Sequence, residues 1–102
     1  MDDSLRQLFL VQLEHGGPWD WSRGLREQEL WDEHAAFMDE LVRDGVVVLG
    51  GPLADEHRVV HVVEADSVEA VRAVFAADPW SGTHLEVDSI DGWTLRLDSR
   101  QP

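Results

Sequence analysis

The chain has 102 residues, of which 43% are hydrophobic, and this is enough for one domain with a real core. Its formal net charge of −13 repels the phosphates of nucleic acids and of anionic membranes, so we expect neither as a partner. All eight basic residues are arginine and there is no cysteine, which excludes a catalytic lysine, a thiolate nucleophile and a disulfide.

Residues 1–4 lack the basic and apolar regions of a secretory signal peptide. The longest apolar run, residues 46–49, is far shorter than the ~20 residues that span a bilayer. We therefore expect a cytoplasmic protein with no membrane partner.

Residues 8–14 are predicted to form the first strand, because large apolar side chains occupy both of its faces. Residues 15–18 end this strand, and a loop that carries Trp19 and Trp21 follows. Two tryptophans so close together in a loop indicate a lid or a pocket wall. The alternative is that they seal the edge of the core.

Residues 26–44 are predicted to form the central helix, since apolar residues recur along one face at steps of three and four. These residues are Leu30, Trp31, Phe37, Met38, Leu41 and Val42. His34 interrupts this apolar face and lies on its core-facing side. Gly45 then supplies the left-handed residue that commonly ends a helix. Residues 46–49 are predicted to form a buried strand that residues 50–52 close.

Residues 58–64 are predicted to form the third strand, which pairs with the second strand as a hairpin. A second helix over residues 67–77 follows, with Asp66 as its N-cap and Glu69 completing a capping box. Residues 78–79 end this helix, because the residue before a proline is displaced from the helical region.

Five apolar residues mark a long final strand, which we expect to bend at residues 91–92. They are Leu85, Val87, Trp93, Leu95 and Leu97. The order of the elements predicts an α+β protein of the ferredoxin-like βαββαβ plan, with a four-stranded antiparallel sheet and two helices on one face. We expect residues 1–102 to form this single domain.

Two helices cover only one face of such a sheet, yet the third strand carries valines on both faces. Val60 and Val62 point to one face, and Val59 and Val63 point to the other. The uncovered face therefore needs an apolar partner, and a second copy of the chain is the economical one. We predict a homodimer.

Several stretches of the chain resemble a known family. They are residues 13–18, 32–38, 44–53 and 76–80, followed by a late tryptophan, Trp93. In this order they are similar to the YCII-related (YciI-like) proteins of the dimeric α+β barrel superfamily, and the resemblance covers nearly the whole chain.

The resemblance implies a homodimer whose two sheets pack face to face as a dimeric α+β barrel. It also implies an active-site pair of a histidine and an aspartate, which maps onto His34 and Asp78. Related folds include isomerases, dehalogenases and monooxygenases that act on small cyclic compounds.

His34 and Asp78 are also suited to acid–base chemistry on physical grounds. In this topology the two helices run antiparallel, so the end of the second helix lies near the start of the first. A carboxylate that holds one imidazole nitrogen leaves the other nitrogen to take or give a proton. The alternative is a core histidine whose hydrogen bonding is satisfied by a structural aspartate.

The five histidines show no metal-ligand spacing such as two histidines four apart on a helix, so we predict no metal site and no cofactor. His57 and His61 fall on a turn and a strand, where surface exposure or strand packing explains them. The Gly-Gly-Pro sequences at 16–18 and 50–52 match no phosphate-binding loop. We interpret them as strand ends that need glycine conformations, with a lesser role in bringing backbone close to a ligand.

The sequence thus predicts a small enzyme that uses His34 and Asp78 for acid–base chemistry of an isomerase, dehalogenase or lyase, or hydrolase type. Its substrate would be a small metabolite, with cyclic and aromatic compounds foremost. The competing interpretation is a non-catalytic dimer that binds a small molecule or has a regulatory role. The candidate ligand-binding residues are Trp19, Trp21, Trp31, Gly51, Pro52 and Trp80.

Overall fold

The computed structural model describes residues 6–100, and it describes side chains for residues 8–100. The elements within these residues are β1 (Arg6–His15), the 3₁₀ helix η1 (Leu25–Glu27), α1 (Trp31–Arg43), β2 (Val47–Pro52), β3 (Arg58–Val63), α2 (Val68–Ala76) and β4 (Leu85–Leu95). None of the helices in this part of the chain has the length and apolar character needed to cross a lipid bilayer.

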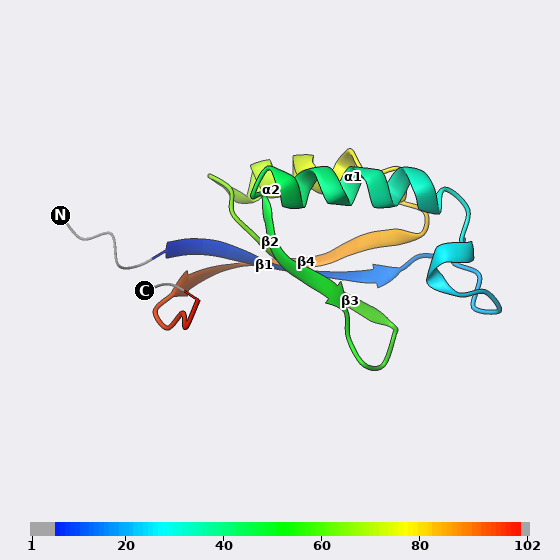
Figure 1. Ribbon diagram of the computed structural model, residues 1–102, viewed down its shortest axis with the longest axis horizontal. Helices are drawn as coiled ribbons and strands as arrows, with labels where there is room; N and C mark the ends of the chain where they lie inside the picture. The colour runs from blue at the N-terminus through cyan, green and yellow to red at the C-terminus, as the bar shows by residue number, and fades with distance from the viewer. Residues whose placement is uncertain (1–5, 101–102) are drawn as a thin grey trace.

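The strands form one antiparallel sheet in the order β2-β3-β1-β4. Figure 1 shows that α1 and α2 lie on the same face of this sheet. The predicted α+β fold, with the ferredoxin-like βαββαβ order, is therefore confirmed. The dimeric barrel stays a prediction.

The core lies between the sheet and the two helices. On β1, Phe9, Val11 and Leu13 face the helices and are buried, as the alternation of a strand requires. From the helix layer, α2 contributes Val71 and Phe75, which are also buried. Burying a side chain of this size contributes roughly 1.5–3 kcal/mol, so these contacts fix the position of α2 and of the residues that follow it.

The central helix begins later than predicted, since α1 starts at Trp31 rather than at Arg26. Before it, η1 (Leu25–Glu27) forms a short turn, and Leu30 adopts a left-handed φ of 63°. Residues 26–29 are all polar and offer no apolar face to bury, so tertiary contacts rather than helical periodicity decide the path of this segment. The predicted helix end is confirmed, because Gly45 has a φ of 77°.

Residues 50–52 lie within β2 and do not close it, contrary to the prediction. Because β2 is at the edge of the sheet, a proline can occupy it without removing a hydrogen bond to a further strand. The strand is only partly buried, since Val47 is 3% exposed whereas Leu49 is 56% exposed. Gly50 does not have a positive φ. A glycine fits at this position because a Cβ would collide with the ring of His61.

The N-cap of α2 is Ser67 rather than the predicted Asp66. The Ser67 hydroxyl accepts a hydrogen bond from the Ala70 amide at 3.1 Å, which satisfies one of the free amides in the first turn. The predicted helix end is confirmed, since α2 stops at Ala76, just before residues 78–79.

The pairing of β4 with β1 is regular at residues 91–92, where we expected a bend, and it is irregular at Asp88. The pairing register with β1 shifts at this point, so β4 carries one extra residue as a β-bulge. The bulge allows Val87 and Ile90, which are three residues apart, to pack against the same core. It also places Trp93 on the face of the sheet that lies away from the helices.

The substitution Gly16→Ala is expected to destabilise the fold, because a Cβ at this position would collide with the main-chain carbonyl of Thr83. Main-chain atoms cannot move aside cheaply, so we expect the free energy of unfolding in urea to fall by about 1–3 kcal/mol. Gly17→Ala is the matched control, since a Cβ there meets no atom within 4 Å. Its effect should stay within about 0.5 kcal/mol, and equal effects of the two substitutions would contradict this packing.

Candidate functional site

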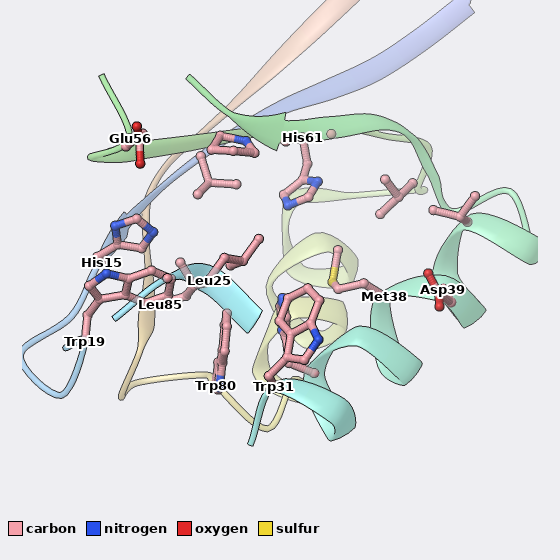
Figure 2. A pocket seen from close by; sticks show the side chains of 18 of the residues that line it. His15, Trp19, Leu25, Trp31, Met38, Asp39, Glu56, His61, Trp80 and Leu85 are labelled. Atoms are coloured by element: carbon pink, nitrogen blue, oxygen red, sulfur yellow. The ribbon is translucent and has the colours of Figure 1, made fainter. Parts of the chain in front are cut away.

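A cavity of about 450 Å³ is lined by β2, β3, one face of α1 along its whole length and the loop after β1. Figure 2 shows side chains from several of these segments directed into it, among them Trp19, Trp31 and His61. Its volume is in the range of small-molecule sites. All six predicted ligand-binding residues line it: Trp19, Trp21, Trp31, Gly51, Pro52 and Trp80. That they bind a ligand stays a prediction.

His34 on α1 and Asp78, two residues after the end of α2, form a buried pair. His34 Nδ1 lies 2.8 Å from Asp78 Oδ1 and 2.9 Å from Oδ2. The two side chains are 10% and 3% exposed. The antiparallel helices thus bring the two residues together as predicted. His34 lines the cavity and Asp78 does not, so Asp78 can act on a ligand only through His34.

The pair fixes which nitrogen of His34 is available for chemistry. An ionised carboxylate can only accept hydrogen bonds. Nδ1 of His34 therefore carries a hydrogen and donates a hydrogen bond to Asp78. Nε2 is then the nitrogen that can take or give a proton. This arrangement can serve a general base or a general acid at the cavity wall.

Trp80 holds both members of the pair in place. Its amide donates to Asp78 Oδ1 at 2.9 Å, and its ring stacks on His34 with centroids 3.9 Å apart and planes at 11°. Its indole Nε1 donates to the Glu29 carbonyl at 2.6 Å, in the segment that leads into α1. Trp31 adds a second ring, 5.9 Å from both His34 and Trp80. The histidine is therefore held between a carboxylate and two indoles.

The two tryptophans of the loop have different surroundings. Trp19 is 9% exposed, belongs to the core and also lines the cavity, so both alternatives for this residue hold. Its ring meets Trp80 edge-on at 5.5 Å and stacks on His15 at 3.8 Å. Trp21 is 58% exposed and lines the cavity from its solvent side. Only Trp21 is placed as an open lid would be.

Gln28 positions this loop, although nothing in the sequence distinguishes it from its polar neighbours. It is only 4% exposed. Its Oε1 accepts from the Asp20 amide at 2.9 Å, and its Nε2 donates to the carbonyls of Asp20 and Arg23 at 2.7 and 3.2 Å. All these partners are backbone groups, so no pattern of residue types in the sequence indicates the interaction.

His61 was expected to be surface-exposed or to pack on its strand; it is 8% exposed and also lines the cavity. The signal for this position was the alternation of β3, which places Val59, His61 and Val63 on the face toward the helices. The pKa of His61 is lowered from 6.5 to about 4, mainly by burial and in lesser part by the nearby His34, while Asp78 opposes the shift. Its Nδ1 is buried without a hydrogen-bond partner among residues 6–100.

The remaining histidines take part in aromatic packing. His15 stacks on Trp19, and burial lowers the pKa of His15, with a further lowering by His57. His84 lies 5.2 Å from the ring of Trp80. In the part of the chain that the structure describes, no three His, Asp or Glu side chains are grouped in a way that could hold a metal ion.

The burial of His61 predicts a pH-dependent stability. Between about pH 6.5 and about pH 4 the unfolded chain binds a proton at His61 that the folded protein does not. The free energy of unfolding should therefore fall with decreasing pH, by about 2 kcal/mol between about pH 7 and about pH 5 from this group. Urea unfolding at the two pH values measures this loss, which should shrink in His61→Leu and in His61→Gln. An equal loss in both variants and in the parent protein would contradict it.

Comparison with known proteins places these residues in a family. A search of the curated proteins gives no significant match. The family model of the YCII-related domain matches residues 20–91, a range that contains His34, Asp78, Trp80 and His61. Since this match spans most of the chain, the protein belongs to the YCII-related domain family.

Proposed function

We propose that this protein is a small acid–base enzyme that acts without a bound cofactor on a small cyclic or aromatic metabolite. The observation that carries the proposal is the buried His34–Asp78 pair at the wall of a cavity of about 450 Å³. Isomerisation, elimination of a halide or another leaving group, and hydrolysis all require a proton to move, and this pair supports such a transfer.

The two residues would have separate roles in the reaction. His34 Nε2 takes a proton from the substrate, and the adjacent carboxylate of Asp78 stabilises the imidazolium that results. Trp80, stacked on the imidazole, limits rotation of the ring, so Nε2 keeps its direction during the transfer. His34 is the catalytic residue and Asp78 is its positioning residue.

The walls of the cavity favour a flat, largely apolar ligand. Trp19, Trp31 and Trp80 contribute large aromatic surfaces, and Met38 and Leu85 add aliphatic ones. Aromatic side chains pack well against the face or edge of a ring. A ring compound would therefore gain contact area in this cavity, while a highly polar one would lose its hydration.

We also propose that the working unit is a homodimer formed through the face of the sheet that lies away from the helices. The pairing of the strands places Leu10, Leu49, Val60 and Trp93 on this face. Leu49 and Trp93 are 56% and 42% exposed. Covering them with the same face of a second copy would be favoured by about 25 cal/mol per Å² of apolar surface.

Turnover of a panel of lactones, halogenated phenols and related ring metabolites tests the enzyme. For any compound converted, His34→Ala and Asp78→Asn should each lower kcat by about 100-fold or more, since each removes the proton-transfer group or its positioning partner. Circular dichroism should show that the variants remain folded. Asp66→Asn is the control for the charge change, because Asp66 is exposed and lies outside the cavity.

Two other results would contradict the proposal. If activity fell only in proportion to the unfolded fraction, the pair would be structural. If compounds of the panel bound tightly and His34→Ala changed neither binding nor any conversion, the protein would be a binding module.

Light scattering of the purified protein should report about twice the chain mass of 11.5 kDa, or a multiple of it. Leu49→Asp places a charge on the proposed interface and should shift the mass toward that of one chain. Leu30→Asp is the matched control, since Leu30 is 48% exposed and lies at the start of α1 on the helix side. A stable monomer of the parent protein at micromolar concentration would contradict the dimer.

A further inference from the structure

Two histidines reach the same cavity from different layers of the fold. His34 comes from α1, and His61 comes from β3. Figure 2 shows the ring of His61 extending from its strand toward Trp31. The two imidazoles differ in what holds their Nδ1 atoms, because only that of His34 is bonded to a carboxylate.

The orientation of the His61 ring follows from its contact with Gly50. A Cβ on Gly50 would fall on Nδ1, Cε1 and Cγ of His61, so the Nδ1 edge of the ring is closed off by the β2 backbone. Nδ1 is buried and has no hydrogen-bond partner within residues 6–100. Because the residue nevertheless lines the cavity, the ring meets the cavity through the edge that carries Nε2.

This packing selects one tautomer of His61. A neutral imidazole has one N–H and one bare nitrogen. A buried N–H without an acceptor is the rarer and costlier defect, so the buried Nδ1 is the bare nitrogen and Nε2 carries the hydrogen. His34 has the opposite arrangement, with its hydrogen on Nδ1 toward Asp78 and its bare nitrogen at Nε2. The cavity wall therefore carries one base, Nε2 of His34, and one uncharged hydrogen-bond donor, Nε2–H of His61.

We propose that His61 donates its Nε2–H to the carbonyl oxygen of the substrate, while His34 transfers a proton at the carbon next to that carbonyl. The inference rests on the proposed function and names its substrate class, an uncharged ring compound with a carbonyl group, such as a cyclic ketone or ester.

The step is a proton transfer without a change of oxidation state. His34 Nε2 removes the proton, the electron pair of the C–H bond becomes the new C=C bond, and the π pair of the carbonyl moves onto oxygen. The hydrogen bond from His61 stabilises the negative charge that develops there. Return of the proton from His34 to the same carbon restores the carbonyl and completes an exchange. Where the substrate already has a C=C bond attached to that carbon, return of the proton to the far end of that bond restores the carbonyl and completes an isomerisation.

The charges around the cavity favour an uncharged substrate over an anion. Asp39 and Glu56 line it, against the single guanidinium of Arg23, and the whole chain has a net charge of −13. A neutral His61 offers a hydrogen bond but no compensating positive charge. A carboxylate or phosphate ligand would therefore be repelled, whereas a ketone or ester oxygen would not.

The tautomer can be measured directly on the parent protein. ¹⁵N NMR of protein labelled at histidine should show His61 at about pH 7 with a protonated Nε2 and a bare Nδ1. A proton on Nδ1, or a charged His61 ring at this pH, would overturn the proposal without bearing on His34 and Asp78.

The chemistry is tested with 2-tetralone, a two-ring ketone with exchangeable hydrogens beside its carbonyl. The parent protein in D₂O should exchange these hydrogens faster than the same concentration of free imidazole, as followed by ¹H NMR. His61→Leu should slow the exchange by about 100-fold, and His61→Gln, which keeps an N–H near the position of Nε2, should restore part of the rate. His57→Leu is the control for replacing an exposed histidine, and it should leave the rate unchanged.

Binding gives a second readout that does not depend on turnover. Tetralin has the same two rings without the carbonyl, so the parent protein should bind 2-tetralone about five- to ten-fold more tightly than tetralin. His61→Leu should abolish this preference while still binding tetralin, which also shows that the variant is folded.

The outcomes separate this inference from the proposed function. If His34→Ala stops the exchange and His61→Leu does not slow it, the role of His61 is wrong and the acid–base function stands. If the parent protein is no faster than free imidazole, the carbonyl class is wrong, and the acid–base function is then decided by the non-carbonyl compounds of the panel.

Discussion

The contact on which the candidate site depends most is that of Trp80 with the His34–Asp78 pair. One side chain stacks on the imidazole, and the amide of the same residue donates to the carboxylate. Trp80 is 1% exposed and also bonds to the Glu29 carbonyl, so it ties the end of α2 to the entry of α1. The geometry of the pair is therefore set by core packing. A change that disturbs the packing of Trp80 would affect both the candidate site and the stability of the fold.

Much of the fold and the central pair could be predicted because both depend on local regularities of the sequence. The periods of the apolar residues distinguish strands from helices, and the order of the elements then leaves few topologies. His34 stands out as an imidazole on an apolar helix face, and Asp78 stands out before a proline that ends a helix. Because the topology brings the end of α2 close to the start of α1, these two unusual residues are expected to form a pair.

The features that could not be predicted depend on contacts between side chains and backbone. Gln28 binds only main-chain groups, and the closeness of Gly50 to His61 depends on the register of β2 against β3. The bulge at Asp88 likewise reverses the faces of β4 beyond it, which no alternation of residue types shows in advance. Such contacts leave no pattern of residue types, so they become visible only once the register is known.

The chain is rich in acidic residues, but the carboxylate of the candidate site differs from the others in being buried. The chain has 21 acidic residues, but Asp78 is the one that is buried among residues 8–100. An exposed carboxylate is hydrated and screened, so it would hold a histidine tautomer only weakly. A buried carboxylate is shielded from competing water, and its bond to His34 Nδ1 leaves Nε2 available to take or give a proton. Nδ1 of His61 has no hydrogen-bond partner among residues 6–100, and the burial of His61 itself keeps this imidazole uncharged. The two histidines of the cavity thus differ because a buried carboxylate holds Nδ1 of His34, whereas the packing of the β2 backbone surrounds Nδ1 of His61.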